Sequence, residues 1–208
     1  MSIQPSLHTA FAGMQCLGTG DLRHVAGAVK EWMDRGEQAH VLIFDDQSSE
    51  PVEIDFRGSL AEVLSRLPPP SVPDAAPAES TDTVPIARSP GRPKLGVVAR
   101  EVTLLPRHWE WLSSQPGGAS VTLRKLVEDR SRANAAKDRQ RLAQESAYRF
   151  MSAIAGDLPG YEEAVRALFA DAPEPFSLET AAWPTDVKAH AQKLAQRAFA
   201  SVSAKPGK

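Results

Sequence analysis

The stretch GRPKLGVVAREVTLLPRHWEWLSSQPGGASVTLRKLVEDR, residues 91–130, decides the fold of the second half of the chain. It begins with basic residues, continues with β-branched and apolar ones, and ends in two helical patterns separated by Gly117 and Gly118. Pro106 suits the first position of a helix, where a backbone N–H has no intrahelical acceptor. Ser120 suits the cap of the next helix. The order predicts one strand followed by two helices.

The strand expected within residues 97–105 has no second strand to pair with in this half of the chain. A lone strand leaves its backbone N–H and C=O groups without hydrogen-bond partners. Two copies of the chain, paired antiparallel through this strand and covered by four helices, would satisfy those groups. The sequence therefore predicts a homodimer.

This order of parts resembles the ribbon-helix-helix family over about residues 94–132. The resemblance rests on VTLLPRHWEWL, on the glycine turn, and on the hydroxyl residue that opens the second helix in GGASVTLRKLV. It implies binding of duplex DNA, with one face of the paired strands in the major groove. In that register Val102 and Leu104 face the core, and Glu101 and Thr103 face the DNA.

Charge is distributed unevenly along the chain. Residues 88–149 hold 13 basic and 6 acidic side chains, whereas residues 1–87 hold 5 basic and 13 acidic ones. Such asymmetry indicates an interaction surface in the middle segment; the alternative is that the acidic and basic parts of the chain attract each other. Basic side chains and the N–H groups of a helix N-terminus suit phosphates. The tripeptide GRP in SPGRPKLG also resembles the core of an AT-hook, which implies an arginine in the minor groove. The predicted DNA-binding residues are Arg92, Lys94, Arg100, Glu101, Thr103, Arg107, Ser120, Arg124 and Lys125.

The remaining segments predict an α+β protein. Residues 1–67 read as an acidic β-α-β-β-α domain, in which Asp21 and Ser59 cap the two helices and PVEIDFRG forms a half-buried strand. Residues 68–90 are rich in Pro, Ala and Ser and read as a disordered linker. The segment 91–132 is followed by C-terminal helices over 133–202 and by a disordered tail over 203–208.

The candidate catalytic and metal-binding residues also have simpler structural interpretations. The carboxylates Asp45, Asp46, Glu53 and Asp55 surround a predicted hairpin, where a solvated face is the simpler interpretation. Asp186 and His190 stand four residues apart on a predicted helix without a third ligand at telling spacing. Cys16 is the single cysteine and has no matching catalytic partners. The sequence predicts no enzyme, no metal and no cofactor.

The whole layout is also similar to a family of uncharacterised bacterial proteins that share AFAG, VLIFDD, IDFRGS and a closing helix that begins WP. That resemblance implies a bacterial source and supplies no activity. No apolar run reaches the length of a membrane span, so the expected location is cytoplasmic. The leading interpretation is a homodimeric DNA-binding protein, a transcriptional regulator or nucleoid-associated factor, with a protein partner at the N-terminal domain. The alternative, which Glu101 favours, is a non-catalytic dimerisation protein that does not bind DNA.

Overall fold

The computed structural model describes residues 7–69, 98 and 100–200. Within them it holds a three-stranded sheet and seven helices, so the protein has an α+β fold. The chain divides into a first unit, Met1–Ser71 with Asn134–Lys208, and a second unit, Val72–Ala133. Most of the predicted linker, from residue 70 on, and the predicted tail 203–208 lie outside the described residues. None of the described helices is both long and apolar enough to cross a membrane.

The sheet of the first unit has β1 (His8–Ala12) at its centre, between β2 (Gln15–Gly20) and β3 (Val41–Asp45). Both pairs of strands are antiparallel. A two-residue turn joins β1 to β2, and Gly13 holds a φ of 56° in it, which favours glycine at the first turn position. Because side chains alternate along a strand, β1 supplies apolar residues to both faces of the sheet.

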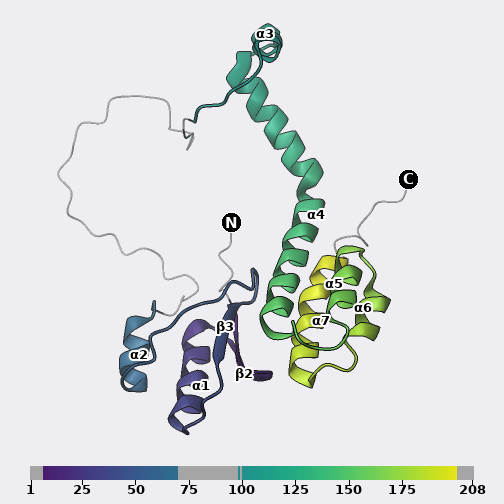
Figure 1. Cartoon of the computed structure of the whole chain (residues 1–208). Helices are drawn as coiled ribbons and strands as arrows, with labels where there is room; N and C mark the ends of the chain where they lie inside the picture. Colours follow the sequence, from purple (N-terminus) through teal and green to yellow (C-terminus); the bar gives the residue numbers. More distant parts are fainter. Residues whose placement is uncertain (1–6, 70–97, 99, 201–208) are drawn as a thin grey trace, which may run out of the picture. The chain divides into compact units, whose positions relative to one another are not determined.

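One face of the sheet packs against α1 (Leu22–Asp34), with α2 (Leu60–Arg66) beside that helix (Figure 1). The predicted caps are confirmed: Asp21 accepts hydrogen bonds from the N–H groups of Arg23 and His24, and Ser59 forms a capping box with Glu62. The core on this face consists of Ala10, Val25, Val29 and Ile43.

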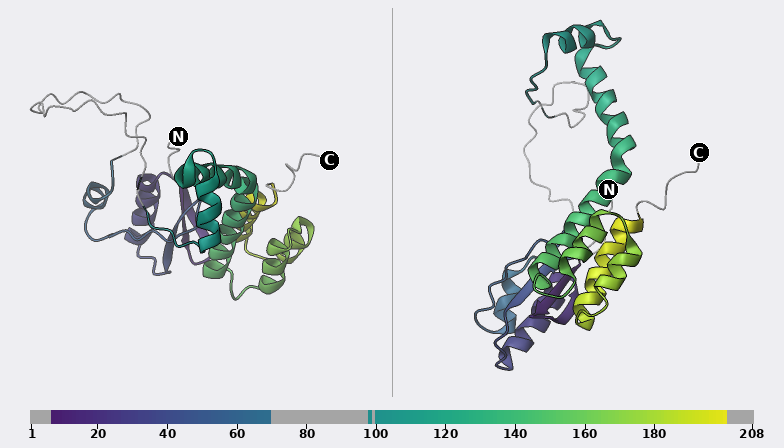
Figure 2. Two further views of the ribbon diagram at one scale, coloured as in Figure 1. Left: turned by 90° about the horizontal axis from the view of Figure 1, so that it is seen from above. Right: turned by 45° about the vertical axis from the view of Figure 1, so that its right-hand side comes forward.

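The other face carries the larger core. It packs against α4 (Gly118–Ile154) and α7 (Thr185–Ala200), and α5 (Tyr161–Phe169) and α6 (Pro173–Glu179) complete the helical layer (Figure 2). The ring of Phe150 of α4 packs against both β1 and β3, with its centroid 5.2 Å from that of Phe11 and 5.5 Å from that of Phe44. These rings join the sheet to the helices in a single core.

The order of strands and helices along the N-terminal block differs from the predicted β-α-β-β-α. The structure has β-β-α-β-α, because QCLGTG forms β2 and because PVEIDFRG meets the sheet only at the bridge between Pro51 and Phe44. The predicted alternation survives in that segment, since Val52, Ile54 and Phe56 are half-buried while the residues between them are exposed. Its backbone leaves β3 after one bridge, so the side chains alternate without a strand ladder.

The N-terminal block and the C-terminal helices, which the sequence treats as separate domains, share one core in the structure. Polar contacts reinforce the junction. The hydroxyl groups of Ser49 and Ser146 lie 2.8 Å apart, and the Asp186 carboxylate accepts a hydrogen bond of 2.9 Å from the backbone N–H of Cys16. The small sheet cannot bury both of its apolar faces by itself, and the helices cover the face that α1 leaves open.

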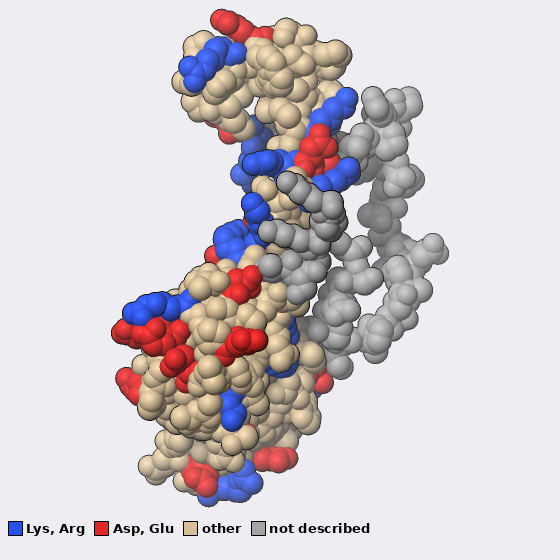
Figure 3. Space-filling view, turned by 90° about the vertical axis from the view of Figure 1, so that its right-hand side faces the viewer, with Lys and Arg blue, Asp and Glu red and all other residues tan. Residues whose placement is uncertain are grey.

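The charged middle of α4, residues 128–141, is continuous helix in which no side chain is fully buried. Figure 3 shows basic and acidic side chains interspersed on the visible surface along this helix. Two of them form an ion pair one turn apart, with 2.8 Å between Arg132 and Glu128. The prediction that any helix here would be solvated or covered by a partner is consistent with this exposure.

Candidate nucleic-acid interface

The two helices predicted in the second unit are present and are separated by the glycine turn. α3 (Pro106–Ser114) starts at the predicted proline and ends before Gln115. Gly117 and Gly118 then adopt φ angles of 91° and 72°, which side-chain-bearing residues rarely adopt. α4 therefore begins at Gly118, and Ser120 lies in its first turn rather than at its cap, contrary to the prediction.

The predicted strand is not formed within the single chain. Val98 and residues 100–105 are described without strand assignment, and no described strand of the same chain pairs with them. The ribbon strand and the homodimer therefore stay predictions. Side-chain exposure alternates in part along this segment, since Leu104 is half-buried while Glu101 and Thr103 are exposed.

Most of the large apolar side chains in the described part of the second unit are exposed. Leu112, at 3% exposure, is the one buried residue among residues 98 and 100–133 that the structure describes. Val102 is 56% exposed and Val127 is 66% exposed. An apolar groove of about 240 Å³ lies between the extended segment and the two helices, lined by Leu104, His108, Trp111, Leu112, Leu123 and Leu126.

Trp109 is 41% exposed in the single chain, and Trp111, two residues further along α3, is 51% exposed. The sequence signal for this apolar surface was available in the helical spacing of Leu123, Leu126 and Val127. Periodicity marks which side chains share a face, but it does not reveal whether the chain itself supplies the cover.

The predicted DNA-binding residues that fall within the described chain are all exposed. Arg92 and Lys94 lie outside the described residues. The Arg124 side chain folds back on its own helix, where its Nε donates a hydrogen bond of 3.1 Å to the carbonyl oxygen of Ser120. The exposed members come from the extended segment, from α3 and from the first two turns of α4: Arg100, Glu101, Thr103, Arg107, Ser120, Arg124 and Lys125.

The acidic residues near β3 are not gathered at one point. Among the described residues, no group of three or more potential metal ligands is found. Asp46 is 3% exposed and is engaged by Thr9 Oγ1 at 2.5 Å and Lys193 Nζ at 2.6 Å. Burial raises the pKa of Asp46, but these hydrogen bonds outweigh it and hold the pKa below its ordinary value. Asp46 is thus a structural link between the sheet and α7.

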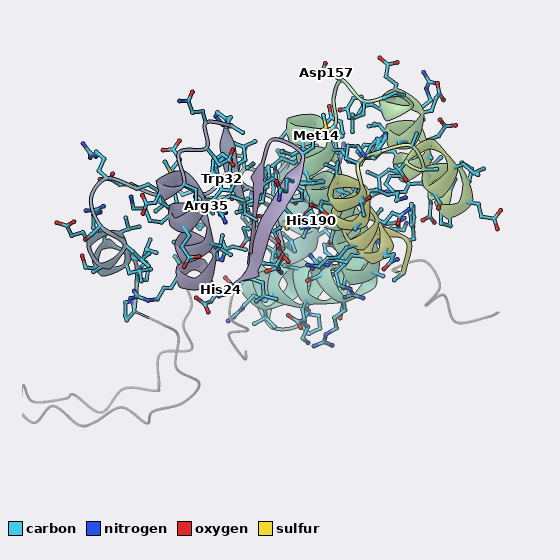
Figure 4. All side chains as sticks on the ribbon, turned by 90° about the horizontal axis from the view of Figure 1, so that it is seen from below. Met14, His24, Trp32, Arg35, Asp157 and His190 are labelled. Carbon is cyan, nitrogen blue, oxygen red and sulfur yellow. The ribbon has the colours of Figure 1, made fainter. Side chains whose placement is uncertain are left out.

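His190 is a buried core residue. Its ring lies 4.5 Å from that of Phe150 and 5.5 Å from that of Phe11, between the sheet and α7 (Figure 4). Its Nε2 atom is buried without a hydrogen-bond partner in the described chain. Burial lowers the pKa of His190 to about 4, and Asp46 offsets part of that shift.

We expect the stability of the first unit to fall as the pH is lowered from about 7 to 5, by about 2 kcal/mol from His190 alone. The folded chain keeps His190 neutral down to about pH 4, whereas the unfolded chain takes up a proton below about pH 6.5. Its stabilising contribution is therefore complete above that pH and is lost toward pH 4. Urea unfolding at the two pH values measures the change. His190→Leu should remove this loss of stability at low pH, and the exposed-site control His24→Leu should keep it. An equal change in the free energy of unfolding between the two pH values in both variants would contradict the expectation.

Comparison with known proteins supplies a family but no activity. No curated protein and no solved structure matches the chain. Residues 7–195 match the model of a family described as an uncharacterized protein conserved in bacteria, DUF2239, and the chain therefore belongs to that family.

Proposed function

We propose that the protein binds duplex DNA as a homodimer through the second unit. The observation that carries the proposal is the exposed apolar surface of residues 98 and 100–133, which bury a single side chain in one copy of the chain. A segment of this size with one buried residue gains too little from burial to offset the entropy of ordering. A second copy that covers Val102, Trp111 and Leu126 would supply the missing core.

The paired segments would form a two-stranded ribbon. In that ribbon Val102 and Leu104 point to the shared core and the residues between them point outward. Leu104 already contributes to the apolar groove, which supports this register. Each copy then contributes one extended segment and two helices, in the arrangement that the resemblance to ribbon-helix-helix proteins implies.

Phosphate contact is the proposed basis of DNA affinity. The first turn of α4 has backbone N–H groups without intrahelical acceptors, and this helix end attracts anions. Arg107, Arg124 and Lys125 are exposed around it, and two-fold symmetry would double their number. Glu101 would lie on the outward face of the ribbon, so the proposal relies on phosphates rather than on base edges.

The alternative is a dimer that does not bind DNA, and two observations favour it. Glu101 is exposed where a DNA-facing residue is expected, and Arg132 is paired with Glu128 rather than left to contact phosphate. In that case the ribbon serves dimerisation alone. Light scattering together with DNA titration separates the two functions, because both require a dimer but only one requires DNA affinity.

We expect affinity for a random-sequence duplex to fall about a thousandfold between about 50 and 200 mM salt, as for some six phosphate contacts. Arg124→Ala with Lys125→Ala should lower the slope of log affinity against log salt by about three to four, because it removes four charges from a dimer. Fluorescence anisotropy of labelled DNA measures both quantities. Arg57→Ala with Arg166→Ala removes equal charge from exposed sites of the first unit and should leave the slope nearly unchanged. Salt-independent affinity, or equal loss in both double variants, would overturn the proposed interface.

A further inference from the structure

A second groove lies in the first unit, on the α1 side of the sheet, opposite the face that His190 occupies (Figure 4). Its volume is about 870 Å³, within the range of binding pockets. The floor is apolar and consists of half-buried or buried side chains from α1, β3 and the segment that follows the Pro51 bridge: Trp32, Val41, Val52, Ile54 and Phe56.

The groove runs along the open edge of the sheet. β3 is an edge strand, and its N–H and C=O groups alternate between β1 and the outside. The backbone N–H and C=O groups of Ile43 point away from β1, because its carbonyl accepts a hydrogen bond of 2.8 Å from Val52 N–H. Val41 is two residues away, so its backbone groups point to the same side. Within the described chain, no backbone hydrogen bond reaches them there.

The charge of the groove is of one sign. Exposed Glu37 and Glu53 are among its lining residues, and no lysine or arginine is. Glu37 follows the end of α1, and Glu53 lies on the segment opposite β3, so the carboxylates come from different walls. A cation placed between them would be attracted from both sides.

We propose that this groove binds an extended segment of a partner protein that adds a strand to β3 and carries lysine or arginine beside alternating apolar residues. The free backbone groups of Val41 supply main-chain hydrogen bonds, and strand addition to an open edge uses such groups. Because the side chains of a strand alternate, one set would enter the apolar floor near Val52 and Ile54. The basic side chains would meet Glu37 and Glu53. This site is independent of the DNA surface proposed for the second unit.

A second copy of the chain is a poorer occupant. Pairing of β3 with β3 would bring Glu37 and Glu53 of the two copies into one groove, where like charges repel. The segment that lines the groove, residues 51–56, is also not cationic enough to exchange between copies, since its charged members are Glu53 and Asp55. The complementary partner is therefore basic and extended.

Random peptides displayed on phage, selected on the full-length protein, test the proposal without a choice of sequence. We expect the enriched peptides to alternate apolar residues and to contain lysine or arginine. A synthetic peptide of the enriched sequence is then titrated by fluorescence polarisation. The proposal would be overturned if no peptides were enriched, or if the enriched peptides were acidic or lacked the alternation. It would also be overturned if the protein associated with itself at the groove and peptide binding were lost for that reason.

Two variants assign the binding to the groove. Val41→Pro removes the outward N–H without touching the ladder to β1, and proline is tolerated at such edge positions. Glu37→Lys with Glu53→Lys reverses the charge. Each variant should lower the affinity for the peptide about tenfold or more, because a main-chain hydrogen bond or a complementary charge pair is lost. Glu162→Lys with Glu174→Lys, at exposed sites of α5 and α6, should change affinity by less than about twofold. Equal binding by all variants would place the peptide elsewhere and refute the site.

Discussion

Replacing Phe150 with alanine is expected to destabilise the first unit by about 4 kcal/mol. Phe150 is fully buried, and its ring contacts Phe11 of β1, Phe44 of β3 and His190 of α7. The truncation would open a cavity at the point where sheet and helices meet, and the surrounding rings cannot collapse into it without leaving their own partners. Urea unfolding followed by far-ultraviolet circular dichroism measures the loss.

Tyr148 provides the matched control on the same helix. Its side chain is 43% exposed, and its ring lies against that of Phe169, at 5.9 Å between centroids. Tyr148→Ala should therefore cost less than about 1 kcal/mol. If Phe150→Ala prevents folding altogether, Phe150→Leu should still fold with a smaller loss of about 1–2 kcal/mol. A cost for Phe150→Ala no larger than that of the control would mean that the sheet and α4 do not share a core.

Local signals in the sequence predicted most helices correctly. Asp21, Ser59 and Pro106 mark helix starts because the first backbone N–H groups of a helix lack intrahelical acceptors. Asp and Ser side chains accept hydrogen bonds from these groups, and proline has no N–H to satisfy. The structure confirms all three helix starts. Two elements were not predicted. β2 contains two glycines and reads as a loop, and α6 is short and starts with Pro173 and Pro175 in its first turn. Their stability comes from neighbours rather than from their own residues.

The junction between the N-terminal block and the C-terminal helices could not be predicted from local patterns. Phe11 and Phe44 read as core residues of a small domain, and Phe150 reads as core of a separate helical domain. The residues in contact are more than a hundred positions apart in the sequence. Apolar periodicity shows which residues of a helix or strand share a face, but it does not show which distant segment packs against that face. The same holds for Asp46, whose partner Lys193 lies 147 residues away and turns a suspected solvated carboxylate into a buried link.

The candidate interface shows the complementary case, in which the sequence predicts exposure of charge but not exposure of apolar surface. Arg107, Arg124 and Lys125 are exposed as expected of basic residues. Val102 and Leu126, by contrast, read as core residues and lie uncovered in one copy of the chain. A contiguous apolar surface of this kind marks an interface.

Val102→Asp combined with Leu126→Asp is expected to convert the proposed dimer into a monomer and to weaken the proposed affinity for duplex DNA about a thousandfold. Both side chains are about half exposed in the single chain, at 56% and 47%, so a charge at either site costs the isolated chain little. In the proposed dimer both sites are buried, and a buried unpaired carboxylate is strongly unfavourable. A monomer would keep only half of the phosphate contacts. Size-exclusion chromatography with light scattering and DNA anisotropy measure the two changes.

The matched control places the same two charges on exposed apolar residues of the first unit. Phe169→Asp with Leu178→Asp alters side chains that are 50% and 75% exposed, and this variant should stay dimeric and lose less than about fivefold in DNA affinity through added negative charge. A wild-type monomer would refute the homodimer. A monomeric Val102 and Leu126 variant that still bound DNA with wild-type affinity would separate the apolar surface from the DNA surface, because in the proposed dimer the pairing of the extended segments brings the basic residues of both copies to one duplex.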